Sequence, residues 1–314
     1  MAQSAATRKH QMSRLEKRNT LIAYSFLAPN FLGFVIFTLI PVIFSIALAF
    51  MNWSGGSKIT FAGLDNFRYI FKDFSFTKSN LGIALSNTVF YTIVTVPLTI
   101  ACALGLALVL NKGVKGAKVF RAVFFFPYVA SLVAICVCWN FLLMKNGPVN
   151  QILRALGFNM MKSWTSSKDL AIWAIIIVSV WRNAGYYMVM YLAGLQGVPA
   201  ELYEAATMDG ANGFQKFTKV TLPMLTPTTF FCSIMMVISC FKIYDVVAIM
   251  TQGGPGRSTK MLVTYIFELS FGGEGIATSA QYGVASAVSM VLLVIVLAVT
   301  FIQFRGEKKW VNYM

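Results

Sequence analysis

The chain has 314 residues, of which 57% are hydrophobic and 12% are charged, whereas soluble domains carry about 25% charged residues. Such a chain cannot bury its apolar surface in one soluble core, so we expect it to lie in a lipid bilayer. The net charge of +15 fits basic residues at the cytoplasmic ends of membrane helices better than nucleic-acid binding. Because the only histidine is His10 in the N-terminal tail and the cysteines lack metal-ligand spacing, we expect no metal and no cofactor.

Six apolar runs are long enough for membrane helices, which need about 20 residues each. The first run is about twice the length of a signal-peptide core, so it is interpreted as an uncleaved span that Pro29 and Pro41 bend or delimit. The sequence therefore predicts an all-α integral membrane protein with six transmembrane helices. The runs are 21–50, 81–110, 119–144, 170–195, 224–250 and 282–304.

Lysine and arginine near the ends of these runs predict the orientation of the chain. Positive charge gathers in the tail before residue 20, in the link 111–121 and after residue 304, which would share one side of the membrane. Both termini are therefore expected in the cytoplasm of a multi-pass protein of the bacterial plasma membrane. The expected division is a cytoplasmic tail (1–20), a first span with an extracytoplasmic loop (21–80), a transmembrane domain (81–305) and a second cytoplasmic tail (306–314).

The segment 196–223 is polar although it lies between two apolar runs, and on this topology it faces the cytoplasm. Pro199 suits the first turn of a helix, and Gly210 suits the residue just past its end. Asn212, with Gln215 three residues later, predicts a capping box at the start of a second helix. On these residues alone, a plain amphipathic connector is an equally good interpretation. One face of the first helix would carry Leu202, Ala205, Ala206 and Asp209.

The stretch EAATMDGANGFQKFTKVTLP, residues 204–223, resembles the EAA loop of binding-protein-dependent ABC import permeases. FRAVFFFPYV, LAGLQGVPAELYEAA and FKIYDVVAIMTQGGPGRST are similar to the sugar-transport branch, in particular to the maltose-type first permease subunit. The resemblance implies the type I ABC importer permease fold, with a cytoplasmic helix-turn-helix coupling loop at about 196–223 that seats in a cleft of the ATPase subunit. It implies coupling roles for Glu204, Ala205, Ala206, Asp209, Gly210, Ala211 and Pro223.

The same resemblance implies a transport subunit rather than an enzyme, since the chain has no phosphate-binding GxxxxGK[ST] loop of its own. The implied partners are a dimer of ABC ATPase subunits, a second and different permease chain, and an extracytoplasmic solute-binding protein. The implied substrate is a carbohydrate, a di- or oligosaccharide. Two alternatives stay open: glycerol-3-phosphate-type solutes carried by the same machinery, and an ion-coupled secondary carrier.

Three ionisable residues, Arg182, Lys242 and Asp245, fall within the apolar runs, where charge is costly and often functional. Lys242 and Asp245 are three residues apart on one expected helix, so they are candidates for mutual neutralisation. Nearby aromatic residues could stack on sugar rings, or could be interfacial anchors. The candidate residues of a solute path are Trp139, Arg182, Tyr186, Tyr244 and Asp245.

Overall fold

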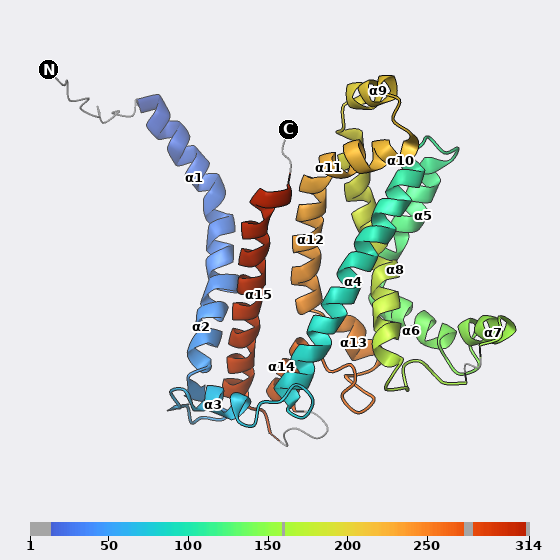
Figure 1. The fold of residues 1–314 in the computed structure, drawn as a ribbon. Coiled ribbons are helices and arrows are strands. Elements are labelled where there is room, and N and C mark those ends of the chain that lie inside the picture. Colours follow the sequence, from blue (N-terminus) through green and yellow to red (C-terminus); the bar gives the residue numbers. More distant parts are fainter. Residues whose placement is uncertain (1–13, 159–160, 273–278, 312–314) are drawn as a thin grey trace.

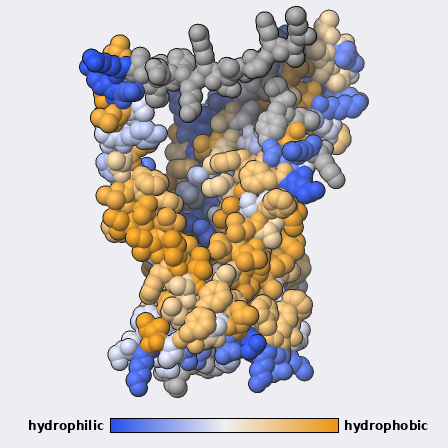
Figure 2. Space-filling view, turned by 90° about the vertical axis from the view of Figure 1, so that its left-hand side faces the viewer, coloured by the Kyte–Doolittle hydropathy of each residue, from blue (hydrophilic) through white to orange (hydrophobic). Residues whose placement is uncertain are grey.

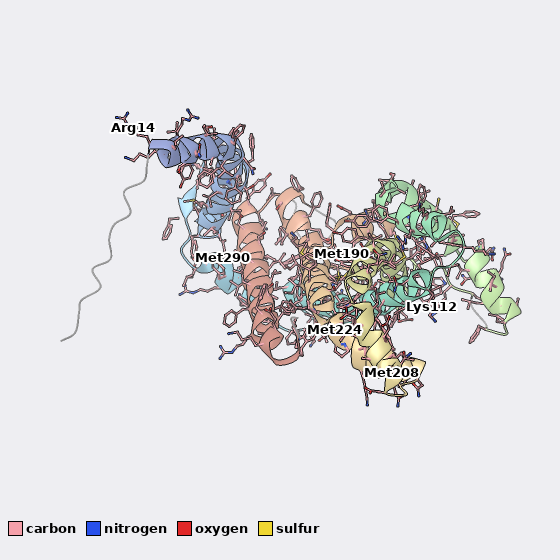
Figure 3. The ribbon with its side chains drawn as sticks, turned by 90° about the horizontal axis from the view of Figure 1, so that it is seen from above. Arg14, Lys112, Met190, Met208, Met224 and Met290 are labelled. Carbon is pink, nitrogen blue, oxygen red and sulfur yellow. The ribbon has the colours of Figure 1, made fainter. Side chains whose placement is uncertain are left out.

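The computed structural model describes residues 14–158, 161–272 and 279–311. Helices form almost all of the regular secondary structure and stand side by side in a row (Figure 1). Seen from above, α1 lies at one edge of the row and α7 at the other (Figure 3). The elements of the first half are α1 (Arg14–Phe34), the π-helix η1 (Val35–Leu39), α2 (Ile40–Leu48), β1 (Met51–Asn52), β2 (Thr60–Phe61), α3 (Asp65–Phe71), α4 (Asn80–Asn111), α5 (Ala117–Val129), α6 (Leu132–Leu142) and α7 (Pro148–Ala155).

The second half continues with the long helix α8 and ends with the long helix α15. Between them lie short helices and a second π-helical segment, which follow one another with few connecting residues. The elements are α8 (Ala171–Gln196), α9 (Ala200–Met208), α10 (Gly213–Lys216), η2 (Phe217–Thr221), α11 (Leu222–Met224), α12 (Thr226–Phe241), α13 (Asp245–Met250), α14 (Leu262–Phe271) and α15 (Tyr282–Trp310).

Four helices of the described residues are long and apolar enough to cross a membrane alone: Lys17–Leu48, Asn80–Asn111, Ala171–Gln196 and Tyr282–Lys308. They correspond to the first, second, fourth and sixth apolar runs. Two further helix pairs are apolar enough together but are sharply bent, which gives up to six spans if each pair counts as one. On the face of the molecule in Figure 2, apolar residues form a band across the middle between more polar ends.

The third apolar run is not one straight helix. Its two parts, α5 and α6, meet at an angle of 96°. Pro127 lies in the last turn of α5 and has no N–H to continue the helical bonding, and Ala130 follows in an extended conformation. The bend therefore lies where the helix already lacks one backbone hydrogen-bond donor, the N–H that Pro127 does not have.

The fifth run is broken as well, and here a prediction from the sequence is wrong. α12 ends at Phe241 and α13 begins at Asp245, so Lys242 and Asp245 do not share a helix. Tyr244, between them, has φ −141° and ψ −54°, which is not helical. The break leaves backbone and polar side chains at this level to line a cavity, the setting in which irregular backbone is tolerated inside a membrane protein.

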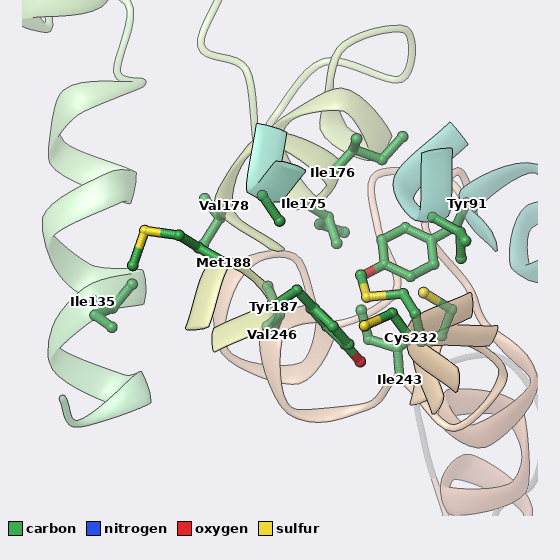
Figure 4. Packing of buried hydrophobic residues seen from close by; sticks show 14 of the residues in the cluster. Tyr91, Ile135, Ile175, Ile176, Val178, Tyr187, Met188, Cys232, Ile243 and Val246 are labelled. Atoms are coloured by element: carbon green, nitrogen blue, oxygen red, sulfur yellow. The ribbon is translucent and has the colours of Figure 1, made fainter. Parts of the chain in front are cut away.

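The main core lies where α4, α8 and α12 pack together (Figure 4). Tyr91 of α4 and Met188 of α8 are among its buried side chains, and Ala103 and Ala107 are fully buried. A Cβ on Gly185 of α8 would overlap the carbonyl group of Phe124 in α5. Small residues thus allow close backbone approach where lipid supplies no hydrophobic drive.

The start of α1, the end of α15 and α9 all lie at one end of the bundle, and α3, α7 and α14 lie at the other (Figure 1). β1 and β2 pair antiparallel, with Met51 opposite Phe61, at this second end. The side chains of α1 are almost all exposed, whereas α2 packs against α15.

Candidate functional site

The segment 199–222 forms the two short helices that the sequence predicts. α9 begins after Pro199, which is the N-cap residue rather than the first helical residue. The capping box is confirmed, because the Gln215 amide donates to Asn212 Oδ1 at 2.9 Å and the Asn212 amide donates to Gln215 Oε1 at 2.8 Å. The start of α10 is therefore fixed by local sequence.

Gly210 makes the turn between these helices and has φ +75°. This left-handed conformation confirms the expectation that a Cβ is disfavoured at this position. A Cβ there would meet nothing within 4 Å, so the preference for glycine is conformational and not steric.

Two side-chain hydrogen bonds attach α9 to the chain that leads into α12. The hydroxyls of Tyr203 and Thr221 lie 3.0 Å apart, and Lys216 Nζ donates to Thr207 Oγ1 at 2.8 Å. Thr221 belongs to η2, and the helices before and after Leu225 meet at 62°. A displacement of α9 would thus be passed directly to the bent entry of α12.

The two helices enclose an open hollow of about 420 Å³, which we call the loop hollow. The four residues expected on one face of α9 all line it, and alanine side chains make its floor shallow. No described residue of this chain fills it. Its lining residues are Leu202, Ala205, Ala206, Asp209, Gly210, Ala211, Gln215, Lys219 and Val220. Glu204 and Pro223 of the predicted coupling set are not among them.

A second cavity, of about 240 Å³, lies at the break between α12 and α13; we call it the inner cavity. Arg182 comes to it from α8, and Tyr244 and Asp245 come from the break itself, so the structure brings three of the predicted path residues together. Tyr128, at the end of α5, and Lys242 complete its polar wall. Ser179, Asn183 and Ser239 add further polar groups.

Arg182 is held mainly by Tyr128. Its guanidinium carbon lies 5.4 Å from the centre of the Tyr128 ring, and Nη2 donates to the Tyr128 carbonyl oxygen at 3.4 Å. Its Nε is buried and makes no hydrogen bond to any described residue. Arg182 therefore bonds a backbone carbonyl, while no ion pair joins it to Asp245 within 4.0 Å in the described part of the chain.

Two predicted path residues lie outside the inner cavity. Tyr186 stacks on Tyr128 with ring centres 4.4 Å apart, so it supports the wall from behind. Trp139 contacts Trp181 edge-on at 5.6 Å in a separate apolar groove of about 960 Å³ between α4, α5, α6 and α8. Sequence analysis missed Tyr128, although its position after Pro127 marks the helix end that turns its ring toward α8.

Comparison with known proteins gives a consistent result. The family model for the binding-protein-dependent transport system inner membrane component matches residues 85–310. The probable ABC transporter permease protein YesP of Bacillus subtilis is 35% identical over 96% of this chain and 95% of that protein. The lactose transport system permease protein LacF of Rhizobium radiobacter is 33% identical over 95% of this chain and 97% of that protein.

Solved structures agree on the fold. A bacterial ABC transporter involved in the import of the acidic polysaccharide alginate has a chain that superimposes with a TM-score of 0.78. It is 22% identical, and the match covers 96% of this chain and all of that chain. At 22% sequence identity, this similarity supports the fold alone.

Proposed function

This chain belongs to the family of binding-protein-dependent transport system inner membrane components, and we propose that it is the permease subunit of an ABC importer that carries a carbohydrate into the cytoplasm. Similar permeases are named for lactose, for trehalose and maltose, and for arabinooligosaccharides. The solute is delivered by an extracytoplasmic binding protein and passes through the inner cavity. ATP hydrolysis belongs to a separate pair of ATPase subunits, and a second permease chain completes the path.

The observation that carries this proposal is the loop hollow, which lies between the short helices α9 and α10 at one end of the bundle. A helix pair this short is not stable alone, so it must dock on its own bundle, on a partner, or on both. Apart from Leu202, all residues that line the hollow belong to the EAA stretch. We assign it as the coupling surface for an ATPase subunit, with Glu204 and Pro223 acting through the ends of the segment.

The topology follows from this assignment. The loop hollow, the start of α1 and the end of α15 share one end of the bundle, so the proposal puts all three in the cytoplasm of a bacterial cell. α3, α7 and α14 then face outward, toward the binding protein. We count six spans, with the bent third and fifth runs each crossing once, and keep the division at residues 20, 80 and 305.

The test is transport by the complete transporter in proteoliposomes. Uptake of an oligosaccharide should require ATP inside the vesicles together with the binding protein, and vanadate should block it. Uptake driven by a proton gradient without ATP would instead support an ion-coupled carrier and would refute the proposal.

A further inference from the structure

A third cavity lies at the outward end of the bundle and shares one wall with the inner cavity. It has a volume of about 640 Å³, within the range of roughly 300–1,000 Å³ typical of small-ligand sites. Tyr244 lines both cavities, so the two adjoin at this residue; we call this one the outer cavity. Its walls are Tyr244, Ala248, Gln252, Gly253, Gly254, Gly256, Arg257, Lys260, Thr264, Phe267, Glu268 and Gly272.

The loop that forms the wall of the outer cavity is held in a defined conformation by its own hydrogen bonds. Gln252 and Arg257 have φ values of 52° and 71°, a left-handed conformation that is uncommon for residues other than glycine. Thr259 is fully buried; its hydroxyl donates to the Gly254 carbonyl oxygen at 2.7 Å and lies 2.8 Å from that of Thr251. Such backbone conformations persist only where the surroundings hold them, and they gather at functional sites.

Among the residues that the structure describes, the outer cavity has more cationic than anionic side chains in its wall. Lys260 and Glu268 pair at 2.7 Å and are largely buried, so their charges cancel. Within the described ranges Arg257 donates to neutral partners, the Asn80 Oδ1 atom at 3.1 Å and the Lys78 carbonyl oxygen at 3.4 Å. The Lys168 side chain lies close by, since a Cβ on Gly256 would come within 2.8 Å of its Cε.

The inner cavity repeats this balance with different residues. Arg182 and Lys242 face a single carboxylate, Asp245. The ion pairs closer than 4.0 Å in the described ranges are Arg68–Asp65, Lys162–Asp169 and Lys260–Glu268, so none of the three inner-cavity charges is paired. Arg182 also keeps a buried Nε without a hydrogen-bond partner among these residues. Counting the side chains described by the structure, the two adjoining cavities are therefore each lined by two cations and one carboxylate.

We propose that the transported solute is an anionic saccharide, whose carboxylate or phosphate is bound first near Arg257 and then at Arg182. A neutral sugar gives these cations no counter-charge, whereas a carboxylate or phosphate accepts the charge-assisted bonds that a guanidinium donates. Arginine and lysine line anion pores for the same reason. Tyr244 and Phe267, with ring centres 5.0 Å apart, give the sugar ring an apolar surface beside the charge. This inference rests on the proposed function.

The first test measures the potential of the cavities directly. In a cysteine-free chain within the complete complex, Ala248→Cys reports on the outer cavity and Ser239→Cys on the inner one. Each is labelled with an anionic sulfonatoethyl and a cationic trimethylammonioethyl methanethiosulfonate, and Ser57→Cys on the exposed β1–β2 loop gives the reference ratio. We expect the anionic reagent to be favoured several-fold at both Ala248→Cys and Ser239→Cys, because cations outnumber carboxylates in the described wall of each cavity.

The preference for the anionic reagent should depend on Arg182. Arg182→Gln should remove most of it at Ser239→Cys, Arg182→Lys should keep it, and Arg154→Gln on α7 should change nothing. A ratio equal to that at Ser57→Cys in the assembled complex would overturn the proposal, because it would mean that acidic groups of another chain already balance the cations.

The second test identifies the anion. Protection of Ala248→Cys from labelling is measured with trigalacturonate, galactose 6-phosphate and maltotriose. Protection by trigalacturonate alone assigns a carboxylate, protection by galactose 6-phosphate alone assigns a phosphate, and either result supports the inference if maltotriose protects at least tenfold less well. Equal protection by maltotriose, or none by either anion, overturns it. Vanadate-sensitive uptake is measured separately, so ATP-driven uptake of maltotriose alone would refute the anionic solute and leave the permease function standing.

Discussion

The substitution Gly210→Val tests whether the turn between α9 and α10 transmits ATPase motion. Gly210 has φ +75° with open space where a side chain would project, so the cost of valine is the left-handed backbone itself, roughly 1–2 kcal/mol. That energy lowers the population of the wild-type turn conformation, relative to all other conformations of the turn, by about 5–30-fold. Since no membrane helix is touched, we expect normal amounts of protein in the membrane and a loss of coupling.

The assay is retention of the ATPase on a tagged permease, together with the number of ATP molecules hydrolysed per solute imported. Gly210→Asn should behave almost like the wild type, because asparagine tolerates the left-handed region. Gly157→Val is the matched control, since Gly157 also has a positive φ, +90°, with no atom within 4 Å, but lies past α7 at the other end of the bundle. If Gly210→Val keeps the ATPase and its coupling, or if Gly157→Val loses them equally, the assignment of the loop hollow is wrong.

Three further predictions follow from the described contacts. Asn150 is fully buried and its Nδ2 donates to the carbonyl oxygens of Met144, before α7, and Lys162, after α7, so Asn150→Leu should destabilise the protein by several kcal/mol, seen as a lower melting temperature in detergent. Lys260→Met should cost about 3–5 kcal/mol by stranding Glu268, and Lys260→Met combined with Glu268→Leu should recover most of the loss in the same melting assay; an equally unstable double variant would argue against the pair. An impermeant thiol reagent should label Ser57→Cys but not Arg18→Cys from outside intact cells, and the opposite pattern would invert the topology.

Sequence reasoning worked best where the determinant is local. The length of the apolar runs is enough to predict α4, α8 and α15, because each crosses without a break. α9 and α10 could also be predicted from the sequence, since Gly210 and the Asn212–Gln215 pair act within a few residues of their own positions. These are short-range effects that need no knowledge of the neighbouring helices.

The break in the fifth run could not be obtained in this way, and the break in the third run was not predicted although Pro127 lies beside it. An apolar count is the same for a straight and a bent segment, and nothing between Phe241 and Asp245 is a proline or glycine. The inner cavity depends on both breaks, since Tyr128 and Tyr244 reach it from the ends of bent segments. The outer cavity could not be predicted from the sequence either, because Lys260 and Glu268 come into contact only when α14 packs against the loop before it.

The exposure of α1 has a consequence for how freely its sequence can vary. From Leu21 to Phe34 its side chains make almost no contact with the rest of the chain, so no neighbouring helix within this chain imposes a shape on them. Selection within the single chain then acts on total hydrophobicity, which sets the free energy of membrane insertion, and not on the identity of each residue. Libraries that shuffle leucine, isoleucine, valine and phenylalanine in this stretch should yield chains that still insert, whereas the same shuffling on the buried face of α8 should not.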